Sequence, residues 1–257
     1  MNRTAAQGAP RLSVNDGVAT ITLGKPEHAN RLSPEDLAAL RRHVDLVNRD
    51  ERILVLRIGS TGKYFCSGYD ISSLADEHAP SSLYFGETMD IVEQARPVTI
   101  AMIQGGVYGG GTDLCLACDF RIGTTRANMF MPATRLGLHF YPGGLQRYVS
   151  RMGLDTAKRL FLTAETLDAE AMLRLGFLTE LTVEDELEER VDELTNVLLA
   201  MAPIPLKGVK KHLNLIARGS FAREDIEDLV NASEASADIV EGALAWKQKR
   251  LPKFTGK

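Results

Sequence analysis

The chain of 257 residues has few of the features that mark metal sites, membrane proteins or nucleic-acid-binding proteins. Its three cysteines, Cys66, Cys115 and Cys118, cannot all pair and have no histidine cluster beside them, so we expect packing roles rather than metal binding or redox chemistry. No apolar run is long enough to span a membrane, and residues 1–12 lack the apolar centre of a signal peptide. The net charge of −4 gives no electrostatic case for nucleic acid or an anionic membrane surface. We therefore expect a cytoplasmic globular protein.

Two glycine-rich loops, each placed between an expected strand and an expected helix, are the most informative feature. The first covers residues 59–70 after an apolar run, and the second covers residues 104–111 after the apolar run 98–103. Three consecutive glycines, 109–111, let a ligand oxygen approach the main chain at a helix N-terminus, where N–H groups carry partial positive charge. Two such loops could direct two backbone donors at one oxygen.

The second loop does not match the common phosphate-binding motifs. Thr112 and Asp113 follow the glycines where a Walker-type loop needs Lys and Ser or Thr, and Leu114 stands where a dinucleotide fingerprint has its third glycine. The carboxylate of Asp113 would repel a phosphate. It would suit a site where a neutral carbonyl gains charge only in the transition state and a carboxylate moves a proton nearby. A glycine-rich packing turn is the alternative.

The order of the expected elements predicts an α/β core, residues 1–202, followed by helices alone. Ser33 and Pro34 have the pattern of an N-cap and first helical residue. Pro203 and Pro205 mark the boundary, after which helices are expected at residues 206–218, 222–237 and 239–250. A segment of roughly 50 residues is too small to hold its own core, so it must pack on the core or on another subunit.

Several motifs together resemble the crotonase (enoyl-CoA hydratase/isomerase) superfamily. They are residues 62–71 (GKYFCSGYDI), 109–119 (GGGTDLCLACD), Leu136-Gly137-Leu138, Pro142 with Gly144, and residues 249–254 (KRLPKF). Each motif is weak alone, but the match covers nearly the whole chain in the expected order. The resemblance implies an α/β spiral of ββα units with a helical C-terminal oligomerisation segment, subunits in a homotrimer or dimer of trimers, and an acyl-coenzyme A substrate without a further cofactor or metal.

The same resemblance implies the site. The thioester carbonyl would lie between the backbone N–H groups of Tyr69 and Gly110, which stabilise an enolate as in an acyl-CoA lyase or isomerase of fatty acid metabolism. The residues implied in coenzyme A binding are Lys25, Arg31, Ser67, Gly68 and Ile71, with Lys253 and Phe254 near the nucleotide. For Lys25 and Arg31, solvated loop charges are the alternative.

The chain departs from the hydratase pattern at one carboxylate. Hydratases of the family have one Glu near the glycine triplet and a second after a proline on the next strand, where this chain has Asp113 and Ala133. Hydration needs one group to activate water and one to deliver a proton to the α-carbon. His139 or Tyr141 could supply the missing group, since histidine titrates near neutral pH; the alternatives are a bond to a backbone carbonyl for His139 and simple packing for Tyr141.

Because of this departure, other functions stay open beside hydration. A double-bond shift, a decarboxylation or a thioester hydrolysis could start from the same enolate. A non-catalytic acyl-CoA-binding protein could keep the fold without turnover.

Overall fold

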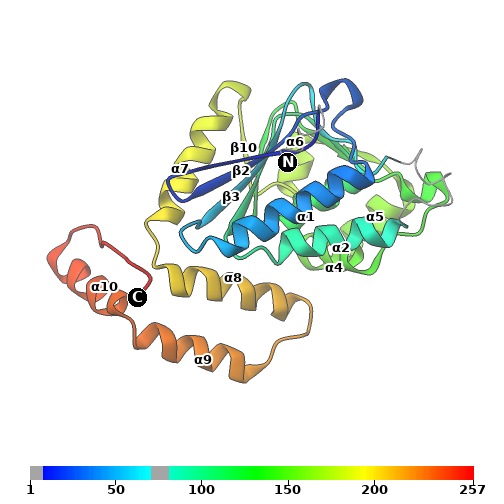
Figure 1. The fold of residues 1–257 in the computed structure, drawn as a ribbon. Helices are drawn as coiled ribbons and strands as arrows, with labels where there is room; N and C mark the ends of the chain where they lie inside the picture. Colours follow the sequence, from blue (N-terminus) through cyan, green and yellow to red (C-terminus); the bar gives the residue numbers. More distant parts are fainter. Residues whose placement is uncertain (1–7, 71–80) are drawn as a thin grey trace, which may run out of the picture.

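The computed structural model describes residues 8–70 and 81–257 (Figure 1). A six-stranded sheet forms its centre, in the order β1-β2-β3-β5-β7-β10. Its strands are β1 (Arg11–Asn15), β2 (Val18–Leu23), β3 (Val55–Ser60), β5 (Val98–Ile103), β7 (Phe120–Thr124) and β10 (Glu180–Thr182). The hairpin β1–β2 is antiparallel and the other neighbours are parallel. Parallel neighbours need crossover connections, and helices supply most of them.

Both faces of this sheet are covered, which explains the continuous apolar run in β5. All six residues of β5 are buried. On one face the sheet packs on α1 (Pro34–Arg49), α2 (Ser82–Glu93) and α3 (Gly110–Ala117). On the other face Ile100 and Ile122 pack with Val191 of α7 (Leu187–Leu199). A strand buried on both faces has no reason to alternate apolar and polar residues.

A second sheet, in the order β4-β6-β8-β9, follows the first like a smaller copy. Its strands are β4 (Tyr64–Cys66), β6 (Gly106–Tyr108), β8 (Asn128–Phe130) and β9 (Thr166–Asp168). Strands β4, β6 and β8 each come directly after β3, β5 and β7, and both sets pair in the same parallel order. The repeated pair of strands, advancing by one position along both sheets, confirms the expected spiral of ββα units.

The remaining helices of the core are α4 (Pro142–Met152), α5 (Leu154–Thr163) and α6 (Ala169–Arg174). Short 3-10 helices cover Pro26–His28, Ala133–Leu136 and Glu184–Glu186. Helix α1 begins as expected, because Ser33 accepts from Asp36 N and the Asp36 side chain accepts from Ser33 N. Within the described residues, no helix is both long and apolar enough to cross a bilayer.

The C-terminal segment consists of α8 (Pro203–Ala217), α9 (Arg223–Glu234) and α10 (Ala237–Gln248). Figure 1 shows α9 and α10 standing away from the sheets, while α8 lies nearer to the core. Helix α8 begins at Pro203 and not after Pro205 as expected, because prolines in a first turn lose no helical hydrogen bond. In this single chain the segment leaves large apolar side chains exposed: Leu213, Ile216, Val230, Ile239, Leu244 and Trp246. Its role in oligomerisation stays a prediction.

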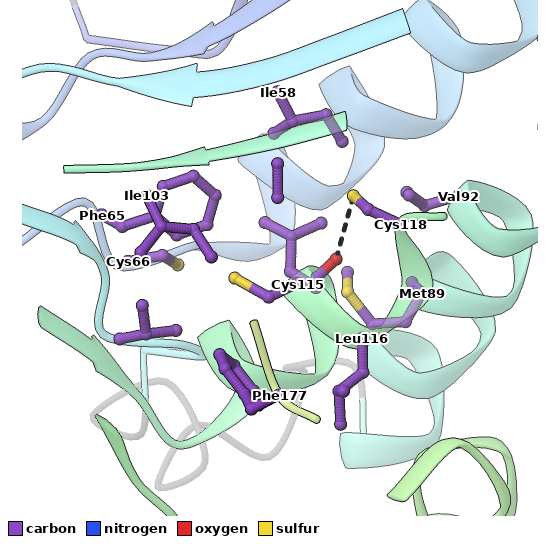
Figure 2. Packing of buried hydrophobic residues seen from close by; sticks show 14 of the residues in the cluster. Ile58, Phe65, Cys66, Met89, Val92, Ile103, Cys115, Leu116, Cys118 and Phe177 are labelled. Atoms are coloured by element: carbon purple, nitrogen blue, oxygen red, sulfur yellow. Dashed lines mark hydrogen bonds between the residues drawn. The ribbon is translucent and has the colours of Figure 1, made fainter. Parts of the chain in front are cut away.

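The three cysteines lie in the core between the large sheet and α3. Figure 2 shows Cys66, Cys115 and Cys118 among Ile58, Ile103, Met89 and Phe177. All three are free and buried, and the Cys118 thiol donates to Leu114 O. Burial raises the pKa of the Cys66 and Cys118 thiols to about 12.

Candidate functional site

The two glycine-rich loops meet at the N-terminus of α3. Gly68 has a φ of +87°, and a Cβ there would lie 2.5 Å from Gly110 N. A Cβ on Gly111 would lie 2.4 Å from Cys66 O. Leu32 N donates to Gly68 O, and Asp70 N donates to Leu32 O. These two hydrogen bonds form a β-bridge within the chain, which holds the first loop in place. Only glycine permits this contact between two backbones.

A cavity of about 300 Å³ opens beside this contact, and both Tyr69 and Gly110 line it. We call it the apolar cavity, because most of its wall is formed by Phe85, Met131, Leu136, Leu138, Phe140 and Tyr141. Gly110 is the first residue of α3, so its N–H has no carbonyl one turn earlier in the helix to bond. A ligand oxygen in the cavity can therefore approach a helix N-terminus.

A second, larger cleft of about 730 Å³ lies next to the apolar cavity. We call it the polar cleft; its charged lining side chains include Arg11, Lys25, Glu27, Arg31 and Asp70, and His28 lines it too. Arg31 and Asp70 line both spaces and form an ion pair of 3.1 Å. The two spaces are thus neighbours that share an Arg–Asp pair at their border.

The loop that carries the cations of the polar cleft is held by Asn30. Its side chain accepts from Lys25 N and donates to Thr61 O and Tyr64 O, each at 2.8 Å. Lys25 is less free than expected, because its Nζ pairs with the buried Asp36 carboxylate at 2.5 Å. Sequence reasoning missed Asn30, although Asn in a polar loop is a residue that tolerates the positive φ of 51° found here.

Asp113 is fully buried, and three donors occupy its carboxylate. The Tyr141 hydroxyl donates to Oδ2, and Arg147 donates from Nε to Oδ1 and from Nη2 to Oδ2, each at 2.7 Å. Among the described residues that line the apolar cavity, Asp113 is absent. This position disagrees with the expectation that Asp113 itself exchanges a proton with substrate.

The other expected proton-transfer groups do line the apolar cavity, together with Ala133. His139 is exposed, and its Nδ1 lies 2.8 Å from Phe140 O. A carbonyl can only accept, so Nδ1 donates to it, and in the neutral ring Nε2 then keeps its lone pair. The backbone contact foreseen as the alternative for His139 therefore does not remove it from acid–base chemistry.

Tyr141 keeps its hydroxyl proton over the whole range in which enzymes work. Burial raises its pKa well above the ordinary value, and the Asp113 charge and hydrogen bond add to the shift. Its ring stacks on Phe140 and lies against Gly86, where a Cβ would be 2.5 Å from the ring. Tyr141 therefore contributes a fixed wall and a neutral hydroxyl.

The remaining expected residues lie at the apolar cavity, outside the described residues, or beside α10. Ser67 lines the apolar cavity, and Gly68 forms the contact below it. Ile71 lies outside the described residues. Lys253 and Phe254 lie beside α10, where Lys253 N donates to Glu241 and the Phe254 ring is near Gly242. In the described part of this chain they reach neither space, so a contact with coenzyme A would have to be made in another subunit.

Sequence reasoning missed Arg147, the main partner of Asp113. It is 1% exposed and lies on the buried stripe of α4 with Gly144 and Tyr148. The helical spacing of these three residues was a readable signal, because an arginine on an inward stripe needs a buried partner.

Comparisons with known proteins agree with the fold and identify the family. Residues 13–257 match the family model described as enoyl-CoA hydratase/isomerase. The trans-2-decenoyl-[acyl-carrier-protein] isomerase of Streptococcus mutans is 28% identical, with 95% of this chain and 97% of the relative covered. The crotonyl-CoA hydratase of Syntrophomonas wolfei is 28% identical, with 96% and 97% covered. Among solved structures, an enoyl-CoA hydratase from Bacillus anthracis has a TM-score of 0.87 at 28% identity, with 96% of this chain and 99% of that chain covered.

Proposed function

The chain belongs to the enoyl-CoA hydratase/isomerase family and is an enzyme of that type, and on this premise we propose how it acts. It binds an acyl-coenzyme A thioester with the acyl group in the apolar cavity and the nucleotide in the polar cleft. The backbone N–H groups of Tyr69 and Gly110 form an oxyanion hole for the thioester carbonyl. The enolate that forms there is common to hydration, a double-bond shift and decarboxylation, whereas thioester hydrolysis would use the same oxyanion hole for a tetrahedral intermediate.

The contact between Gly68 and Gly110 carries this proposal. It brings the residue after Gly68 and the first residue of α3 to one end of the apolar cavity, so their N–H groups can share one oxygen. Donors fixed in advance, in a space that excludes water, stabilise developing negative charge strongly. The loss of one such donor typically costs about 3 kcal/mol of barrier stabilisation.

The polar cleft supports the placement of the nucleotide. Arginine side chains bind phosphate with two parallel hydrogen bonds, and Arg11 and Arg31 both line the cleft. Lys25 contributes less than these arginines, since its Nζ is already paired with Asp36. Arg31 at the border would lie between the phosphates and the pantetheine arm.

The cavity wall favours chemistry with one proton-transfer group. Asp70 is the carboxylate among its described lining residues, and it is paired with Arg31. Ala133 has no titratable group, and Asp113 lies behind the wall. We therefore assign proton transfer to Nε2 of His139 and favour a double-bond shift, in which one base removes a proton and returns it at another carbon.

Exchange of the α-protons of butyryl-CoA in D2O tests the enolate and its base together. We expect NMR to show deuterium uptake with the parent protein, and an uptake about 10²-fold slower with His139→Gln. His43→Gln, on α1 and outside the linings of both spaces, is the control and should keep the parent rate. Parental exchange in His139→Gln would refute the assignment of the base, and absence of exchange in the parent would refute the enolate mechanism.

Hydration remains the second candidate, because several relatives carry hydratase names, such as the crotonyl-CoA hydratase above. The absorbance of the conjugated thioester separates the two reactions. A double-bond shift of 3-enoyl-CoA increases this absorbance, whereas hydration of crotonyl-CoA decreases it. We expect the first to be faster. Faster hydration would place a water-activating group in the site that our assignment lacks.

A further inference from the structure

A buried ionic network lies behind the wall of the apolar cavity. Arg147 bonds Asp113 as described, and its Nη1 lies 2.6 Å from Asp90 Oδ1 and 3.2 Å from Glu93 Oε2. Arg218 of α8 also pairs with Asp90 and Glu93, and Arg151 lies 3.7 Å from Glu93. Three carboxylates thus face three guanidinium groups, and the network is balanced in charge.

The Asp113 carboxylate connects the helix that carries the proposed oxyanion donor with the wall of the apolar cavity. It lies on α3, one turn after Gly110. It also accepts from Tyr141, whose ring forms the wall of the apolar cavity. A shift of this one carboxylate would therefore move the expected oxyanion donor and the cavity wall relative to each other.

Besides Asp113, α3 is held by packing and by the Thr112 hydroxyl, which lies 2.5 Å from the Tyr148 hydroxyl of α4. Phe85 packs against Gly110, and Cys66 O packs against Gly111; such packing limits how far the helix can shift. The N-cap residue is Gly109, which has no side chain to cap the helix. The two parallel bonds from Arg147 are directional, since a planar fork fixes both the place and the plane of a carboxylate.

We propose that Arg147 is a positioning residue for the thioester site, acting through Asp113 to fix the Gly110 N–H and the Tyr141 wall in one geometry. This inference rests on the proposed oxyanion hole and deepens it. Asp113 is then the carboxylate that orients the site, and it exchanges no proton with substrate. Lysine cannot replace Arg147 in this role, because an ammonium group is a point charge without the planar fork.

Two altered proteins test the role of the fork without leaving a bare buried charge. Arg147→Lys keeps the charge and loses the fork. The double variant Asp113→Asn with Arg147→Gln removes both charges and keeps a hydrogen-bond acceptor for Tyr141. The control is Arg121→Lys, because Arg121 is a buried arginine that bonds Cys118 O at the opposite end of the same helix.

The measurements are the affinities for butyryl-CoA and for its thioether analogue, in which CH2 replaces the carbonyl, and the C=O stretching frequency of bound [1-13C]butyryl-CoA. The parent should prefer the thioester and lower the stretching frequency. Both altered proteins should lose about ten-fold of this preference and shift the frequency back toward that of free ligand, with the thioether affinity unchanged. Arg121→Lys should lower the melting temperature and keep the preference and the frequency.

The outcomes separate this proposal from the function on which it rests. Parental preference and frequency in folded Arg147→Lys and in the double variant would overturn the positioning role and leave the oxyanion hole standing. An equal loss in Arg121→Lys would also overturn it, since any weakening of α3 would then suffice. A parent that does not distinguish thioester from thioether would overturn the oxyanion hole, and the positioning role with it.

Discussion

At the scale of single residues, glycine at position 68 allows the first loop to lie directly against α3. Gly68 and Gly153 have similar φ angles, +87° and +81°, but Gly153 has open space where a Cβ would be. Both changes to alanine strain the backbone, by about 1–3 kcal/mol. Gly153, with a ψ of 159°, lies in a region that is essentially restricted to glycine. At Gly68 the added methyl group would also push α3 away from the first loop, since it would lie 2.5 Å from Gly110 N.

We therefore expect Gly68→Ala to lose α-proton exchange by at least about ten-fold, while Gly153→Ala keeps it. Thermal unfolding of both variants gives the matched stability scale. If Gly68→Ala exchanges protons like the parent, the two loops need not touch for activity, and the assignment of Tyr69 and Gly110 loses its basis.

Site residues that belong to local motifs could be predicted from the sequence, whereas contacts between distant positions could not. The close approach of the two loops was readable, because a glycine triplet between a strand and a helix lets another backbone or a ligand come near, although a packing turn was the alternative. The stripe on α4 indicated only that Arg147 faces inward. Its pairing with Asp113 could not be predicted, since the two residues are 34 positions apart and nothing local couples them. The position of Asp113 in the family motif suggested contact with substrate, and its burial followed from that distant arginine.

At the scale of elements, α2, α3, α4 and α8 are held together by the ionic network around Arg147. Burial alone would raise the pKa of the Asp90 carboxyl, but hydrogen bonds from Arg147 and Arg218 outweigh burial and hold it below its ordinary value. A carboxyl with a lowered pKa stabilises the fold above its unfolded-state pKa, and this stabilisation is lost as the pH falls through its folded-state pKa.

We expect the free energy of unfolding to fall as the pH drops below the ordinary range of carboxyl groups, and to fall less steeply in Asp90→Asn. Denaturant titrations at several pH values measure both slopes. The control is Asp45→Asn, because Asp45 pairs with Arg49 on the exposed face of α1. Equal slopes for the parent and Asp90→Asn would show that the network contributes nothing to acid sensitivity.

The elements themselves were largely predictable where local rules decide. The Ser33-Pro34 start of α1 and the buried strand β5 were found as expected, since capping and burial patterns are local. The acidic stretch from residue 184 is less predictable, since it begins with a 3-10 turn, Glu184–Glu186, before α7. Such details depend on tertiary packing, which a sequence pattern does not contain.

At the scale of the whole molecule, the exposed apolar faces of α8 and α10 predict assembly. Trp246, the one tryptophan of the chain, is 88% exposed in the single chain. Such exposure is costly for a large aromatic ring, and a trimer or hexamer would bury it. We expect light scattering to give the mass of a trimer or a hexamer at micromolar concentration, with tryptophan emission at the short wavelengths of a buried ring.

Trp246→Glu should dissociate the assembly, whereas Lys247→Glu, at the neighbouring exposed position, should leave it intact. If the chain is a stable monomer with the red-shifted emission of a solvated tryptophan, the oligomer is refuted. The expected contact of Lys253 and Phe254 with coenzyme A would fall with it, since within this chain neither residue lines the polar cleft.

The three buried cysteines can report how often the region around α3 opens. A thiol reacts as thiolate, and with a pKa of about 12 the thiols of Cys66 and Cys118 are almost entirely protonated as well as covered. An electrophilic label can therefore reach them only when the α3 region opens. The labelling rate in native buffer then measures how often the helix that carries Gly110 separates from its sheet. Acyl-CoA should slow this labelling more as the bound fraction of the protein rises. Labelling that acyl-CoA leaves unchanged would mean that ligand binding and the opening of α3 are independent events.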